Sequence, residues 1–129
     1  MKQMTLMEKY PLFVLELNKE ETGKKSVDEI ITYLKEKIES HPVATYIATF
    51  DHYAHTKSLT EGEVSPDIQA AKNIVFCFGK ELPKPEVMGV RPRSIGVADL
   101  GEKFVISFLE APNPVANNAM EEWVKGLRG

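Results

Sequence analysis

The feature that most constrains the fold is a helix signalled at both ends between residues 26 and 41. Ser26-Val27-Asp28-Glu29 fits a capping box, in which Ser26 accepts from the Glu29 N–H and the Glu29 carboxylate reaches back to the Ser26 N–H. His41 precedes Pro42, and the residue before a proline is pushed out of the α region. The apolar residues between these ends recur at helical spacing: Val27, Ile30, Ile31, Leu34 and Ile38. We therefore expect an amphipathic helix that packs on one face of a sheet.

Short runs of β-branched, aromatic and alternating residues predict the strands of that sheet. The first run is Tyr10 to Leu17, where Pro11 belongs at the start of the strand or on an edge because it lacks an N–H. Asp99-Leu100-Gly101-Glu102 predicts a hairpin turn between the last two strands. The expected strands are residues 10–17, 43–54, 73–78, 94–98 and 104–109.

The remaining segments predict one more long helix, one or two short helical turns and an irregular loop. Asn113-Pro114 predicts a helix start, and apolar residues at helical spacing continue to Leu127. Ser65-Pro66-Asp67 favours one or two helical turns over residues 66–71, and residues 79–93, rich in proline and glycine, predict an irregular loop. The chain is thus expected to be a single α+β domain, residues 1–129, with a largely antiparallel sheet and two main helices packed on one face.

Composition excludes several classes of function. The net charge of −3 gives no basic field for nucleic acid, and no apolar run is long enough to span a bilayer. Cys77 is the only cysteine, so no internal disulfide forms, and residues 1–8 lack the apolar core of a signal peptide. No P-loop or dinucleotide fingerprint occurs. We expect a cytoplasmic protein with no membrane or nucleic-acid partner and no cofactor.

One candidate site lies at the end of the second predicted strand, where Asp51, His52, Tyr53 and His55 gather. If the strand runs on unbroken, Asp51, Tyr53 and His55 share one face and His52 points to the other. A metal bound by His52 and His55 then needs a local irregularity, since His-x-x-His spacing suits a helix or turn. The alternative is that these polar residues end the strand and form local hydrogen bonds.

The second candidate site is Arg91-Pro92-Arg93, which holds two of the three arginines in the chain. Arginine offers a planar fork for bidentate contact with carboxylate or phosphate. The loop could hold an anionic ligand, or its arginines could pair internally with carboxylates such as Asp99 or Glu110. We expect the main cleft between residues 51–57 and 80–93, with Tyr53 or Phe50 in its wall.

The order of elements from Val43 to Leu127, with Cys77 in an apolar strand and Glu110-Ala111-Pro112-Asn113-Pro114 before the last helix, resembles the bacterial family called domain of unknown function 302. The resemblance implies a compact α+β domain prone to dimerise, and it carries over only Cys77. It implies no biochemical activity.

Two functions remain open from the sequence. The first is a non-enzymatic binding or interaction protein, expected to be a homodimer, because the chain has apolar strands but no complete catalytic set. The alternative is a small enzyme or metal-binding protein that uses Asp51, His52 and His55, while Arg91 and Arg93 hold an anionic ligand.

Overall fold

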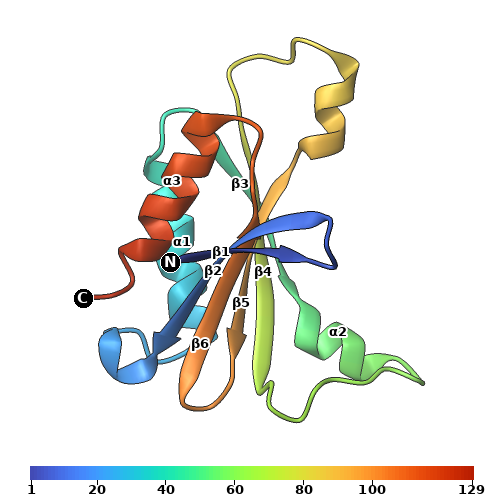
Figure 1. The fold of residues 1–129 in the computed structure, drawn as a ribbon, viewed down its shortest axis with the longest axis vertical. Coiled ribbons are helices and arrows are strands. Elements are labelled where there is room, and N and C mark those ends of the chain that lie inside the picture. The colour runs from blue at the N-terminus through green and yellow to red at the C-terminus, as the bar shows by residue number, and fades with distance from the viewer.

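The computed structural model describes residues 1–129 as one six-stranded antiparallel sheet with two long helices on one face (Figure 1). The strands follow one another across the sheet in the order β1-β2-β6-β5-β4-β3. The strands are β1 Lys2–Leu6, β2 Tyr10–Asn18, β3 Ala44–Asp51, β4 Ala70–Phe78, β5 Arg93–Asp99 and β6 Lys103–Leu109. The helices are α1 Val27–Ser40, α2 His52–Ser58 and α3 Pro114–Lys125, with 3₁₀ turns η1 Lys19–Glu21 and η2 Pro85–Val90. The predicted α+β fold with an antiparallel sheet is confirmed.

The core lies between the sheet and the pair α1 and α3. The predicted cap is present, because the Ser26 hydroxyl accepts from the Glu29 N–H at 3.2 Å. Helix α1 contacts β3, β4 and β5, and α3 contacts β2 and α1. Trp123 of α3 stacks on Phe78 with ring centroids 5.6 Å apart. Alternate strand residues supply the other side of the core: Phe13, Leu15, Leu17, Ile74, Phe76, Phe78, Ile95, Val97, Phe104, Ile106 and Phe108.

The opposite side of the sheet, here called the open face, is not covered by α1 or α3 (Figure 1). Strand alternation places on it the residues between the core positions. They are Lys2, Met4, Leu6, Tyr10, Leu12, Val14, Glu16, Asn18, Thr45, Ala48, Phe50, Ala71, Asn73, Val75, Cys77, Ser94, Gly96, Ala98, Lys103, Val105, Ser107 and Leu109. Only the short helix α2 lies at one border of this face.

The strand predicted to reach Ala54 is shorter than expected. Strand β3 ends at Asp51, whose carboxylate accepts from the Ala54 N–H at 2.8 Å and so starts α2 at His52. A register shift between Tyr46 and Ala48 also breaks the predicted alternation. The expectation that His52 and His55 sit on opposite faces of one strand is therefore wrong.

Two other segments differ from the expectation. Residues 66–71 form a turn and the start of β4 instead of helical turns, because the Gln69 N–H donates to the Asp99 carbonyl at 2.8 Å and extends the pairing with β5. The N-terminal residues form the additional strand β1. Its turn into β2 places both Met7 and Glu8 at positive φ, a type I′ geometry usually signalled by Asn-Gly. No helix of the chain combines the length and apolar character needed to cross a bilayer.

Candidate functional site

Arg91 and Arg93 meet at one cavity where β5 begins. The cavity has a volume of about 240 Å³ and lies between the η2 loop, the ends of β4 and β6 and the start of α3. Most of its wall is apolar, and Asn113 is its other polar residue. The cavity, here called the arginine cavity, is lined by Phe78, Val87, Val90, Arg91, Arg93, Ala111, Pro112, Asn113 and Ala116.

Arg93 is the only polar or charged residue buried in the protein, at 9% exposure. Strand alternation places its side chain on the helix-covered side of β5, with Ile95 and Val97. Its guanidinium donates to the Val90 carbonyl at 3.2 Å and to the Leu109 carbonyl, while Nε has no partner. No carboxylate forms an ion pair with it, and burial lowers the pKa of Arg93 from its usual value. A positive charge is thus held in a desolvated place without a counter-ion.

Arg91 lies beside Arg93 and reaches over the backbone of Gly79. Its guanidinium donates to the Glu81 carbonyl at 2.8 Å. Gly79 has φ of 134°, and a Cβ there would lie 3.0 Å from the Arg91 terminal nitrogens, so glycine makes room for the guanidinium. A second cavity of about 380 Å³ shares Phe78, Arg91 and Asn113 with the first and extends toward residues 79–83.

The alternative of internal ion pairs for these arginines is wrong. Asp99 pairs with Lys19 at 3.0 Å instead, and Glu110 takes part in no ion pair. Neither Arg91 nor Arg93 is held by a carboxylate, and both guanidinium groups donate to backbone carbonyls instead.

The start of α3 adds to the positive character of the arginine cavity. Asn113 caps the helix, since its Oδ1 accepts from the Val115 N–H at 2.9 Å. That contact leaves the amide N–H groups of Asn113 for another acceptor. The N-terminal end of a helix carries a partial positive charge, which favours an anion nearby. Three sources of positive potential therefore meet at one apolar cavity.

The histidine cluster lies elsewhere, at the border of the open face. The Phe50 ring lies 5.4 Å from the His52 ring and 5.3 Å from the His55 ring, centroid to centroid. His52 Nδ1 is 3.1 Å from Asn73 Oδ1, and Tyr53 lies under the Lys57 ammonium at 5.7 Å from its ring centroid. No group of three or more His, Cys, Asp or Glu side chains is placed to hold a metal ion.

The sheet separates the two predicted clusters. Arg93 points to the helix-covered side, whereas His52 contacts Asn73 on the open face. The arginine cavity is completed by residues 111–116, and none of the five main cavities is lined by residues 51–57. The prediction that the main cleft lies between residues 51–57 and 80–93 is therefore wrong, because the largest cavity is lined by neither segment, and only residues 87–93 contribute to the smaller arginine cavity.

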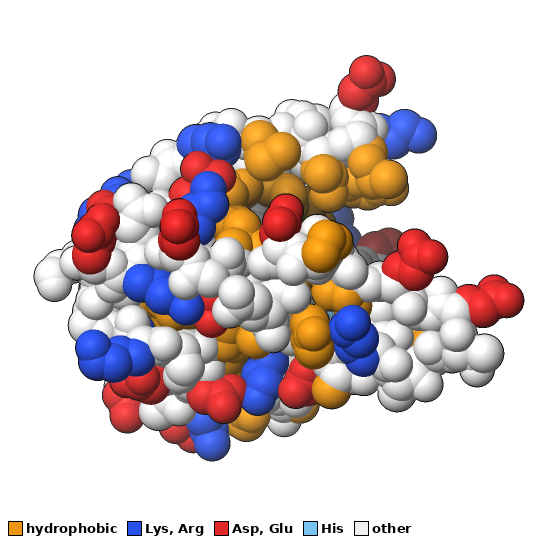
Figure 2. Space-filling view, turned by 90° about the horizontal axis from the view of Figure 1, so that it is seen from below, with side chains coloured by type: hydrophobic (Ala, Val, Ile, Leu, Met, Phe, Trp, Pro, Cys, Tyr) orange, Lys and Arg blue, Asp and Glu red, His pale blue; other side chains and the backbone are white.

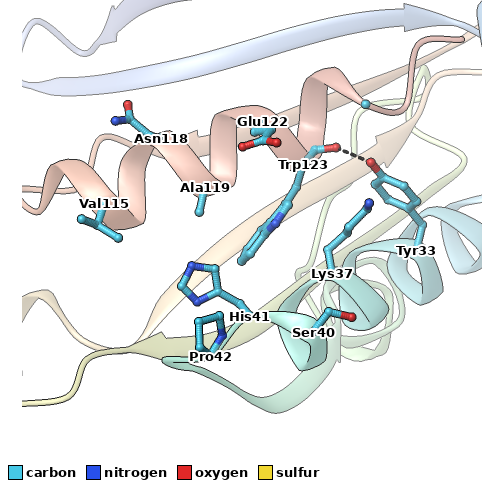
Figure 3. Close-up of a pocket in the computed structure, with 11 residues that line it drawn as sticks. Tyr33, Lys37, Ser40, His41, Pro42, Val115, Asn118, Ala119, Glu122 and Trp123 are labelled. Atoms are coloured by element: carbon cyan, nitrogen blue, oxygen red, sulfur yellow. Dashed lines mark hydrogen bonds between the residues drawn. The ribbon is translucent and has the colours of Figure 1, made fainter.

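The largest cavity, of about 700 Å³, is an open groove between α1 and α3 that the sequence did not reveal (Figure 3). The Tyr33 hydroxyl closes one end by donating to the Trp123 carbonyl at 2.7 Å. Burial, and then the nearby Glu122 carboxylate, raise the pKa of Tyr33 from its usual value. Lys37 and Glu122 give the groove charges of both signs. Its walls come from two distant segments, residues 33–42 and 115–126, so no local motif marks it.

Comparisons with known proteins assign a family without an activity. A search of the curated proteins and a search of the solved structures each found no match. The resemblance to domain of unknown function 302 is not supported, because the family model that matches is a different one. That model covers residues 1–129, and the chain accordingly belongs to the family of unknown function DUF6858.

Proposed function

We propose that the protein is a non-enzymatic binding protein that holds a small organic anion in the arginine cavity. The observation that carries the proposal is Arg93, whose guanidinium is buried, lines the cavity and has no carboxylate partner. Buried charges in proteins are normally paired, because an isolated ion in a medium of low polarity is costly. A bound anion supplies the missing partner.

The wall of the cavity indicates the class of anion. Five of its nine lining residues are hydrophobic, so the ligand needs an apolar body as well as a charged end. The volume of about 240 Å³ corresponds to roughly eight waters at about 30 Å³ each. A small aliphatic or aromatic carboxylate matches both features better than inorganic phosphate, which has no apolar part.

Binding is favoured over catalysis by the groups that are present. The arginine cavity contains hydrogen-bond donors, Arg91, Arg93 and Asn113, but no histidine, carboxylate, thiol or hydroxyl among its lining residues. A general base and a nucleophile are therefore lacking at the place where the ligand would lie. Asp51, His52, Tyr53 and His55 cannot supply them across the sheet.

Calorimetric titration with benzoate tests the proposal, with benzamide as an uncharged ligand of nearly the same shape. We expect benzoate to bind and benzamide to bind at least about tenfold more weakly, a difference of about 1.4 kcal/mol. Arg91→Gln should weaken benzoate binding and leave benzamide unaffected. An anion site would be refuted if benzoate and benzamide bound equally well. It would also be refuted if benzoate, butanoate and phosphate all failed to bind.

A homodimer is the second part of the proposed function, and a separate observation supports it. Four large apolar residues of the open face, Met4, Leu6, Tyr10 and Leu109, are each 40 to 50% exposed. Contiguous exposed apolar patches on a folded domain mark interaction sites. Sedimentation velocity at tens of micromolar checks the assembly state, and a monomer at that concentration would contradict it.

A further inference from the structure

The open face combines an apolar surface with a hollow shape. Strands β1 and β2 form a hairpin at one border, and α2 follows the edge strand β3 at the other. In Figure 2 the molecule is hollowed on the right, the side on which Figure 1 places this hairpin and α2, and hydrophobic side chains gather on the upper rim. Met7 in the turn of the hairpin is 75% exposed.

We infer that the open face is the interface between two copies of the chain, with the β1–β2 hairpin of each copy seated in the hollow of the other. The inference rests on the homodimer part of the proposed function and is independent of the arginine cavity. The two copies are related by a two-fold axis, so each contributes the same surface to the interface.

The charges of the open face fit a copy of itself better than another partner. A two-fold interface places the same patch against itself, so a strongly charged patch would repel its own copy. Lys103 and Glu16 neutralise each other at 3.3 Å, and Lys2 is the remaining charge of the strands on this face. One lysine is too little positive charge to attract an anionic membrane, which takes a cluster of basic residues.

The area is sufficient for a specific contact. Six strands at a spacing of ~4.8 Å are about 24 Å wide, and six residues at ~3.3 Å each give a length of about 20 Å. The face therefore offers about 500 Å² per copy, or about 1,000 Å² in total, at the lower bound for a specific interface. The curved hairpin adds to this area when it enters the hollow of the partner.

Both edges of the sheet are poor sites for pairing between copies. Strand β3 has a register shift between Tyr46 and Ala48, and such bulges interrupt the row of hydrogen-bonding groups. Strand β1 at the other edge is only five residues long. A face-to-face contact is thus favoured over a continuous sheet through two copies.

The test measures the dimer dissociation constant of the full chain by sedimentation velocity. Leu6→Glu and Met4→Glu place a charge on the hairpin at positions that are 44% and 40% exposed, so each variant should fold as the wild type does. We expect both to raise the dissociation constant at least about tenfold. The matched control is Leu82→Glu, at a 63% exposed position in the loop 79–93, which should dimerise as the wild type does.

Three results would overturn the inference. The first is a wild type that stays monomeric up to hundreds of micromolar, and the second is a dimer that both hairpin variants leave intact. The third is a monomer that cosediments with phosphatidylcholine vesicles, which would make the open face a lipid contact. Benzoate titration of Leu6→Glu separates this inference from the anion site, because the arginine cavity lies across the sheet and binding there should be unchanged.

Discussion

Replacing Arg93 with methionine separates a ligand-binding role from a structural one. Methionine has an unbranched stem of similar length and no charge. The change removes two hydrogen bonds from the guanidinium, to the carbonyls of Val90 and Leu109. Hydrogen bonds from charged donors contribute about 1.5 to 3 kcal/mol each, so the loss is about 3 to 6 kcal/mol.

The same change relieves two unfavourable features. The unpaired Nε–H costs about 1 to 3 kcal/mol, and a buried charge without a counter-ion costs several kcal/mol more. The gains and losses are of similar size. We therefore expect the free energy of unfolding of Arg93→Met, without ligand, to stay within about 1 kcal/mol of the wild type.

Urea unfolding with and without benzoate measures both effects. A ligand at 100 times its dissociation constant stabilises the folded state by about 2.7 kcal/mol, and this gain should disappear in Arg93→Met. The control is Arg128→Met, since Arg128 is exposed and pairs with Glu21 at 3.1 Å; it should keep the gain. The contrary result would be a free energy of unfolding that falls by more than about 2 kcal/mol in the unliganded variant, with the stabilisation by benzoate retained. It would show that Arg93 stabilises the fold and does not bind the ligand.

Three further predictions concern the rest of the fold. Asp51→Ala removes the side chain that accepts from the Ala54 N–H at 2.8 Å, so thermal unfolding should show a loss of about 1 kcal/mol and a frayed α2. Gly126→Ala places a Cβ 2.5 Å from the Tyr33 hydroxyl and should break its hydrogen bond to α3, at about 1 kcal/mol; a double mutant with Tyr33→Phe should then lose less than the sum. Burial, followed by Glu122, raises the pKa of Tyr33, so its contribution is present below the unfolded value of about 10 and lost as pH rises through the folded pKa. Urea unfolding between neutral and strongly alkaline pH should therefore show a steeper decline in the wild type than in Tyr33→Phe.

The parts of the fold that local chemistry determines could be predicted from the sequence. The cap at Ser26 and the proline after His41 set the ends of α1, and runs of β-branched and aromatic residues predict β2, β4, β5 and β6. Residue type alone makes Arg91 and Arg93 candidates for a binding site, and both line the arginine cavity. These features need no knowledge of distant segments.

The remaining features depend on contacts that local patterns do not reveal. The sequence pattern predicts a strand through Asp51, whereas its side chain caps α2 and ends β3 there. The turn between β1 and β2 lacks the usual Asn-Gly pair, since Met7 and Glu8 occupy its positive-φ positions. Asn113-Pro114 predicts the start of a helix, but only the tertiary fold brings Asn113 into the same cavity as Arg93, twenty positions earlier. The wall of the arginine cavity that residues 111–116 form is therefore determined by tertiary contacts.

Amide chemical-shift mapping with benzoate is the most direct test of the proposed anion site. We expect saturable shifts concentrated at residues 87–93 and 111–116, absent with benzamide and absent in Arg93→Met. Benzoate shifts confined to the groove between α1 and α3 or to residues 51–57, or no saturable shifts at all, would contradict it.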